Sequence, residues 1–83
     1  MKEREYTGIK DWKLQPINEG SIVITQQGTK FVVVWKQKHN QWCIIQSNQG
    51  DHKELQGDWF KLERYMQSNL EVIGSIYDNP ELI

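Results

Sequence analysis

The chain has 83 residues, of which 37% are hydrophobic and 25% charged, a balance typical of one small folded domain and too apolar for a disordered chain. Ten basic and eleven acidic residues leave a formal net charge of −1, which excludes strong nonspecific attraction of the whole surface to nucleic acid. Any nucleic-acid contact therefore requires a local basic patch. We expect a single domain over residues 1–83.

Cysteine content and apolar runs indicate the compartment. Cys43 is the single cysteine and lies in the apolar run 42–45, so we expect a buried, inert thiol and no internal disulfide. No apolar stretch follows the first five residues, so no signal peptide is expected. No run approaches the roughly 20 apolar residues that span a bilayer. The sequence favours a cytoplasmic protein with no membrane contact.

Alternating hydrophobicity between turn signals predicts three short strands in the first part of the chain. The β-branched run 21–25 ends at a Gln-Gln-Gly turn. Residues 29–37 and 41–47 follow, with a short polar turn between them. A period of two puts Phe31, Val33 and Trp35 on one face of the first run and Lys36 on the other. Such runs, joined by three- or four-residue turns, favour an antiparallel meander.

The hydrophobic period changes after a polar loop at residues 48–51. Trp59, Leu62 and Met66 recur at three- and four-residue spacing, which predicts one or two helical turns of α or 3₁₀ type. Asp58 precedes them and suits the N-cap position.

The last segment returns to an extended pattern over residues 70–77, with Gly74 as a candidate bulge or close-approach position. A meander, a short helical or 3₁₀ turn and a final strand predict a mainly all-β fold. We expect a small SH3-like antiparallel barrel, whose strands curl to hide their edges. An OB-type barrel is the nearest alternative, but it usually needs more residues and a longer helix.

The two ends of the chain carry distinctive motifs. Residues 6–11 read Tyr-Thr-Gly-Ile-Lys-Asp, residues 17–23 read Ile-Asn-Glu-Gly-Ser-Ile-Val, and residues 73–82 read Ile-Gly-Ser-Ile-Tyr-Asp-Asn-Pro-Glu-Leu. These stretches resemble the YopX-type phage and prophage protein family, which tends to read Tyr-Thr-Gly-Leu-x-Asp, Ile-Tyr-Glu-Gly-Asp-Ile-Val and Ile-Gly-Asn-Ile-Tyr-Glu-Asn-Pro-Glu-Leu. The resemblance implies the C-terminal SH3-like part of such a protein, without the longer N-terminal part of many relatives.

The motif residues suit structural roles. We expect Gly8 and Gly20 to permit positive φ or close backbone approach, and Asp11 to cap a turn. The family's usual Asn-Gly turn is replaced here by residues 12–16, Trp-Lys-Leu-Gln-Pro. Because turn and core residues identify a fold, function has to be argued from the surface.

No catalytic or cofactor motif is present. His39 and His52 lie in separate polar loops, and the stretch Asp51-His52-x-Glu54 does not have the spacing of a known metal site. Neither a glycine-rich phosphate loop nor a Ser-His-Asp pattern occurs. We therefore expect a non-enzymatic protein with no metal and no cofactor.

One candidate surface is a basic hairpin with interleaved aromatics, which suits phosphate contacts and base stacking. The candidate nucleic-acid-binding residues are Lys30, Lys36, Lys38, Trp35 and Trp42. The alternative is that the lysines form a solvated strand face while the tryptophans fill the core.

Two further surfaces are candidates for a protein partner. Tryptophans beside turns often anchor interfaces, and the segment 70–83 carries acidic but no basic side chains. The candidate partner-binding residues are Trp12, Trp59, Glu71, Asp78 and Glu81. The alternatives are that the tryptophans cover the ends of a barrel and that the carboxylates only solvate the chain end.

The resemblance implies a phage or prophage accessory protein, and small proteins of that kind often act on host machinery. We expect the chain to bind a bacterial protein, in concrete form as an anti-CRISPR-like inhibitor of a host defence system. One alternative is an SH3-like nucleic-acid-binding module that uses the lysine hairpin. Another is a self-assembling structural phage protein that forms homo-oligomers.

Overall fold

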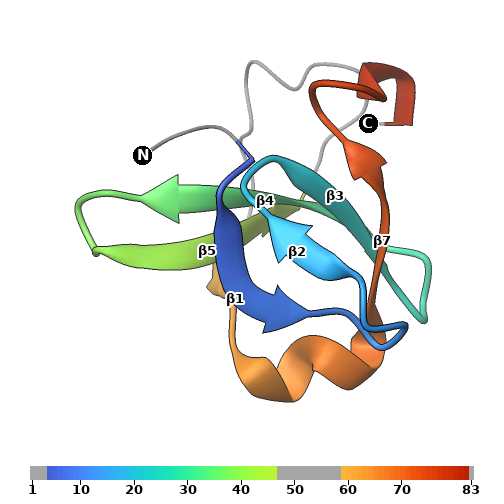
Figure 1. Cartoon of the computed structure of the whole chain (residues 1–83), viewed down its shortest axis with the longest axis horizontal. Coiled ribbons are helices and arrows are strands. Elements are labelled where there is room, and N and C mark those ends of the chain that lie inside the picture. The colour runs from blue at the N-terminus through green and yellow to red at the C-terminus, as the bar shows by residue number, and fades with distance from the viewer. Residues whose placement is uncertain (1–3, 47–58, 83) are drawn as a thin grey trace.

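The computed structural model describes residues 4–46 and 59–82, which form two antiparallel sheets (Figure 1). The small sheet pairs β1 (Tyr6–Lys10) with β2 (Pro16–Asn18). The larger sheet has the strand order β6-β5-β4-β3-β7. Its strands are β3 (Ser21–Thr25), β4 (Lys30–Lys36), β5 (Gln41–Gln46), β6 (Trp59–Lys61) and β7 (Leu70–Ser75). The 3₁₀ helices η2 (Arg64–Asn69) and η3 (Pro80–Leu82) lie on either side of β7 in the chain.

The predicted meander is confirmed. β3, β4 and β5 are antiparallel neighbours, with Ile22 opposite Val32 and Val33 opposite Ile44. Their bounds agree with the predicted runs to within one residue at each end. Alternation defines these strands well because successive side chains point to opposite faces, and a slip of one residue would expose the whole apolar set.

The predicted helical turn from Trp59 onwards is wrong in position. Trp59 pairs with Ile45 as part of β6, and the 3₁₀ helix η2 begins only at Arg64, directly before the last strand. Aromatic residues fit a pleated surface, and pairing with β5 provides backbone hydrogen bonds that an isolated helical turn could not match. Asp58, expected as the N-cap, and the polar loop 48–51 lie outside the described residues.

A mainly β fold is confirmed, but the sheet is not closed into the expected SH3-like barrel. Strands β6 and β7 lie at opposite edges of the larger sheet and do not pair with each other in the described chain. The outer edge of β7 instead meets the β1–β2 loop. The backbone N–H of Trp12 donates to the carbonyl of Leu70 at 3.2 Å, and the backbone N–H of Val72 donates to the Asp11 carboxylate at 2.9 Å. Because this loop covers the edge of β7, the sheet needs no closure there.

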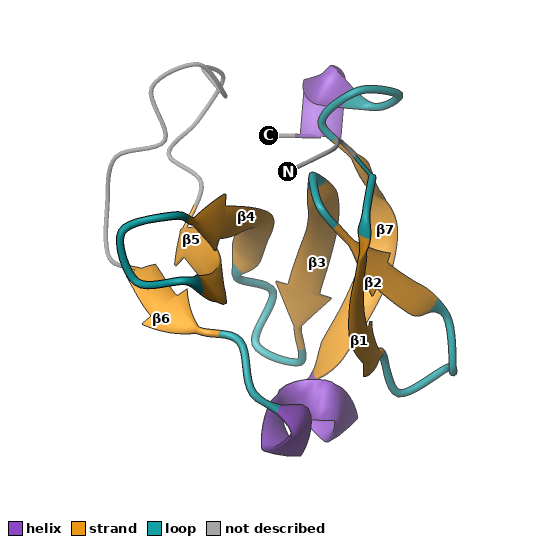
Figure 2. Cartoon of the chain, turned by 60° about the vertical axis from the view of Figure 1, so that its left-hand side comes forward, coloured by secondary structure: helices purple, strands orange, loops and turns teal. Residues whose placement is uncertain are grey.

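The core lies between the larger sheet and the β1–β2 hairpin, which crosses one face of that sheet (Figure 2). Its buried side chains are Ile17, Val23, Phe31, Val33, Ile44, Leu62 and Leu70. Burial of each large aliphatic side chain contributes about 1.5–3 kcal/mol of transfer free energy. Trp42 and Met66 pack against this cluster from its rim, so β5 and η2 both attach to the same core.

The glycine predictions are confirmed. Gly8 and Gly20 adopt φ of 89° and 82°. The register of β3 against β7 shifts by one residue before Gly74, and a Cβ there would lie 2.6 Å from Asn79 Oδ1. Gly74 is therefore both beside a bulge and a point of close approach. Within the part of the chain that the structure describes, no helix is long and apolar enough to cross a bilayer.

Candidate functional site

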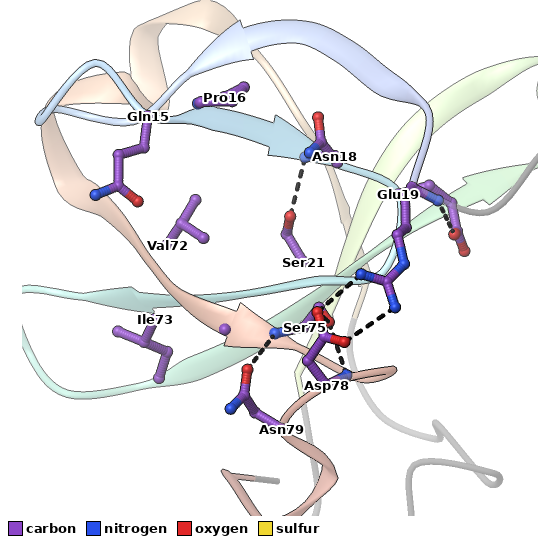
Figure 3. A pocket seen from close by; sticks show the side chains of 12 residues that line it. Gln15, Pro16, Asn18, Glu19, Ser21, Val72, Ile73, Ser75, Asp78 and Asn79 are labelled. Atoms are coloured by element: carbon purple, nitrogen blue, oxygen red, sulfur yellow. Dashed lines mark hydrogen bonds and ion pairs between the residues drawn. The ribbon is translucent and has the colours of Figure 1, made fainter.

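A polar cavity of about 360 Å³ lies between β2 and β7, where the two motif-bearing ends of the chain meet (Figure 3). Polar groups along it already bond to each other. Ser21 Oγ accepts the N–H of Asn18 at 2.9 Å, and Asn79 Oδ1 accepts the N–H of Ser75 at 3.3 Å. These bonds shape the β2–β3 turn and the chain after β7, so the lining residues mainly serve the scaffold.

An ion pair crosses the rim of this cavity. Arg4 donates from both terminal nitrogens to Asp78, at 2.8 and 3.0 Å, in the bidentate geometry that favours arginine with carboxylates. The hydrogen bond from Arg4 holds the pKa of the Asp78 carboxyl below its usual value. Glu19 Oε1 accepts both the backbone N–H of Arg4 at 3.0 Å and the hydroxyl of Tyr77 at 2.6 Å. The start and end of the described chain are thus tied together.

The acidic residues predicted for a partner do not form one acidic surface. Glu71 pairs with Lys13 at 3.1 Å, Asp78 pairs with Arg4, and Glu81 is exposed in η3. Two of the three charges are balanced by cations from the start of the chain. The segment 70–83 carries only acidic charges, but the fold brings basic side chains from the first 13 residues against it.

The β4–β5 hairpin and β6 together form a second polar region. The His39 ring stacks on Trp59 with centroids 5.3 Å apart and an interplanar angle of 28°. Lys36 Nζ lies 5.5 Å from the centroid of the Trp59 ring. Trp59, predicted as an anchor for a protein partner, therefore lies beside Lys36, one of the lysines predicted for nucleic acid.

Two more lysines complete this region. Lys61 of β6 is opposite Cys43 of β5, and Lys38 is exposed in the hairpin turn. Neither lysine, nor Lys36, forms an ion pair with any residue in the described ranges. We call Lys36, Lys38, His39, Trp59 and Lys61 the basic hairpin patch. Lys61 was not predicted as part of a site, because this segment was expected to be helical. Residues two apart, such as Trp59 and Lys61, share a face in a strand but not in a helix.

Cys43, which is opposite Lys61 of this patch, is fully buried, as predicted. Burial raises the pKa of the Cys43 thiol, while a contact with Gln41 and the nearby charges of Lys36 and Lys61 act in the opposite direction. Lys61 is opposite Cys43, Cys43 is opposite Val34, and Lys36 follows Val34 by two residues, so both lysines are on the same face of the sheet as Cys43. A buried thiol with a raised pKa is a poor nucleophile.

The other residues predicted for nucleic acid lie elsewhere. Lys30 Nζ donates to the carbonyl of Leu82 at 2.8 Å, at the far end of β4, roughly 20 Å along the strand from Lys36. Trp35 and Trp42 pair edge to face across β4 and β5, with centroids 5.0 Å apart, and Trp42 packs on the core. The structure thus separates these three residues from the basic hairpin patch.

The β1–β2 loop presents apolar side chains to solvent. Trp12 is 52% exposed and Leu14 is 68% exposed. Lys13 Nζ lies 5.2 Å from the centroid of the Trp12 ring and also pairs with Glu71, which fixes the loop against β7. A depression of about 150 Å³ lies beside Trp12. Leu14 was not predicted, although it belongs to the stretch 12–16 that departs from the family pattern.

The described residues do not form a metal site in either region. Among residues 4–46 and 59–82, no group of three or more His, Cys, Asp or Glu side chains is arranged to hold a metal ion. Asp51, His52 and Glu54 lie outside the described residues.

The fold and these contacts define a small, mainly β domain whose two motif-bearing ends join around one polar cavity. The chain belongs to the YopX family, since the family model described as "YopX protein" matches residues 3–83, essentially the whole chain. No curated protein matches it.

Proposed function

We propose that this YopX-family chain is a non-enzymatic phage or prophage accessory protein that binds a bacterial protein through its β1–β2 loop. Its concrete form is inhibition of a host defence system, such as a CRISPR-associated nuclease. The exposure of Trp12 and Leu14 on a well-anchored loop carries this proposal.

The loop is held in one conformation by its own backbone. Asp11 donates its N–H to the carbonyl of Gln15 at 2.8 Å, and Leu14 donates to the carbonyl of Asp11 at 3.0 Å. The Asp11 side chain also accepts the N–H groups of Lys13 and Gln15. A large apolar side chain on a fixed loop loses little conformational entropy on binding, and tryptophan is enriched among residues that dominate binding energy.

The position of the loop in the chain supports the same proposal. Motif residues such as Asp11 and Gly20 have structural roles: Asp11 joins the β1–β2 loop to β7, and Gly20 forms a turn with positive φ. The stretch 12–16 departs from the family pattern and carries the two exposed apolar side chains. Loops on a rigid scaffold are where binding residues concentrate.

The chemistry of the chain's thiol supports a role without catalysis. Cys43 is the single cysteine, and its side chain is fully buried in the middle of β5. Since burial raises the pKa of its thiol, it does not offer a nucleophile to a substrate.

The test is affinity capture from a bacterial host lysate with three versions of the protein as baits. Their melting temperatures are compared first, so that a loss of binding is not a loss of folding. The baits are the parent, the double variant Trp12→Ala/Leu14→Ala, and the control Trp59→Ala, which removes a comparably exposed tryptophan elsewhere. We expect one protein to be retained by the parent and the control and lost with the double variant. Calorimetry on the purified pair should then show a loss of about 2 kcal/mol or more for Trp12→Ala.

A captured nuclease is then assayed for cleavage with increasing amounts of the parent or the double variant. Inhibition by the parent alone supports the defence-inhibitor form. Retention of the same proteins by all three baits would contradict the role of the loop.

A further inference from the structure

We propose that the basic hairpin patch is a second binding site, and that its ligand is single-stranded nucleic acid. The patch lies at the β6 side of the larger sheet, whereas the β1–β2 loop lies at the β7 side (Figure 2). The proposal goes beyond the protein-binding function above, and each can fail without the other.

The lysines of the patch converge on one face. Cys43 of β5 is opposite Lys61 of β6 and opposite Val34 of β4. Lys36 follows Val34 by two residues, so Lys36 and Lys61 are on the same face of the sheet, with β5 between their strands. Strands two positions apart in a sheet are separated by roughly 10 Å, so one extended strand of nucleic acid can pass both ammonium groups. Among residues 4–46 and 59–82, neither lysine forms an ion pair.

The aromatic part of the patch is preorganised for stacking. Trp59 is 42% exposed, and His39 is exposed and stacks on it at an angle of 28°. The outer surface of such a stack can continue with a nucleic-acid base, because every base has a flat face that stacks on an aromatic ring. Cationic side chains beside stacked aromatics are the combination found in channels for single strands.

An acidic protein segment fits the patch less well. Carboxylates would use only the lysines, and exposed lysine–carboxylate pairs contribute little to binding because water and salt screen them. A nucleic acid uses the ammonium groups and the aromatic stack together. Because the net charge of the chain is −1, no long-range field assists binding, so the affinity is local and modest and falls with salt.

The test uses fluorescence anisotropy of a labelled oligothymidylate of about ten nucleotides at about 50 mM salt, with a salt titration. We expect the double variant Lys36→Gln/Lys61→Gln to weaken binding by at least about tenfold and to reduce the log–log salt slope by about 1.4, that is 0.7 for each of two phosphate contacts. The control Lys10→Gln/Lys13→Gln removes the same charge from the β1–β2 hairpin and should change the affinity by less than about twofold.

The stacking component is tested at Trp59. Trp59→Ala should weaken binding by at least about fivefold, while Trp59→Phe should retain most of it. Should Trp59→Ala fail to fold, the exposed lysine variants still decide the question. Trp12→Ala/Leu14→Ala should leave oligonucleotide binding unchanged, which separates this site from the proposed protein-binding loop.

Three outcomes would overturn the proposal. They are no binding of the oligonucleotide at about 50 mM salt, an equal loss in the Lys10→Gln/Lys13→Gln control, and equally effective competition by a polyglutamate peptide of the same charge. The last outcome would assign the patch to acidic protein segments instead.

Discussion

Asp11 and Val72 are joined by a hydrogen bond of 2.9 Å, in which the backbone N–H of Val72 donates to Asp11 Oδ2. The other oxygen, Oδ1, accepts the N–H groups of Lys13 at 3.0 Å and Gln15 at 2.7 Å. Asp11 is fully buried, so one carboxylate satisfies three backbone donors and joins the β1–β2 loop to the outer edge of β7. That edge would otherwise expose unpaired backbone groups.

Removal of this carboxylate should destabilise the fold strongly. We expect Asp11→Ala to lower the free energy of unfolding by about 2–4 kcal/mol, because it leaves backbone donors without a partner in a buried place. Asp11→Asn should cost less, because one oxygen remains for Lys13 and Gln15. Urea unfolding measures both, with the exposed Glu81→Gln as a control expected within about 0.5 kcal/mol of the parent. An equally small effect for Asp11→Ala would contradict the anchoring role.

Gly20 should be more sensitive to substitution than Gly28. Both have positive φ, of 82° and 89°, but a Cβ at Gly20 would collide with the ring of Tyr77, whereas a Cβ at Gly28 meets nothing within 4 Å. Gly28→Ala carries only the backbone cost, about 1 kcal/mol. We expect Gly20→Ala to cost about 2–4 kcal/mol, measured by thermal or urea unfolding of the two variants side by side. Equal costs would show that Tyr77 moves aside without penalty.

The ion pair between Asp78 and Arg4 should contribute to stability in a pH-dependent way. The hydrogen bond from Arg4 lowers the pKa of Asp78 in the folded protein, so the unfolded chain binds the proton more tightly. The contribution is therefore complete above the unfolded pKa of about 3.9, and it is lost as the pH falls through the lower folded pKa. The melting temperature of Asp78→Asn should lie below that of the parent at pH 7, and the difference should vanish in strong acid. A difference that stays constant down to pH 2 would mean that the carboxylate charge is not involved.

Cys43 should be protected from thiol reagents in the native state. It is fully buried, and burial raises the pKa of its thiol, so both access and thiolate content are low. We expect its reaction with an aromatic disulfide reagent at pH 8 to be at least about a hundredfold slower than in denaturant. Rapid stoichiometric reaction of the native protein would contradict the burial of the Cys43 side chain.

The role of Asp11 shows where sequence interpretation ends. An aspartate two residues before a backbone donor predicts a turn cap, and the bonds to Lys13 and Gln15 confirm it. The bond to Val72 spans 61 positions and has no local signal. Lys36 and Trp35, by contrast, were predicted on opposite faces from alternation alone, since neighbours in a strand never share a face, and both residues lie in β4.

Trp59 is the clearest case of tertiary structure overriding a local pattern. Its spacing to Leu62 and Met66 fits a helix, yet the segment pairs with β5 because an open strand edge offers more backbone hydrogen bonds than one isolated turn. That pairing brings Trp59 against His39 and Lys36, and no period in the sequence encodes this contact.

The sequence by itself determined the strands β3, β4 and β5, the positive φ of Gly20, the cap at Asp11 and the family, because each depends on residues that are close in the chain or on motifs within it. Only the tertiary structure decided that the sheet stays open, that Trp59 joins the basic hairpin patch, and that Glu71 and Asp78 are balanced by Lys13 and Arg4. These features depend on which distant strand edges and charges meet. That choice is a small difference between large packing, hydrogen-bonding and entropy contributions, and it is made by the whole chain together.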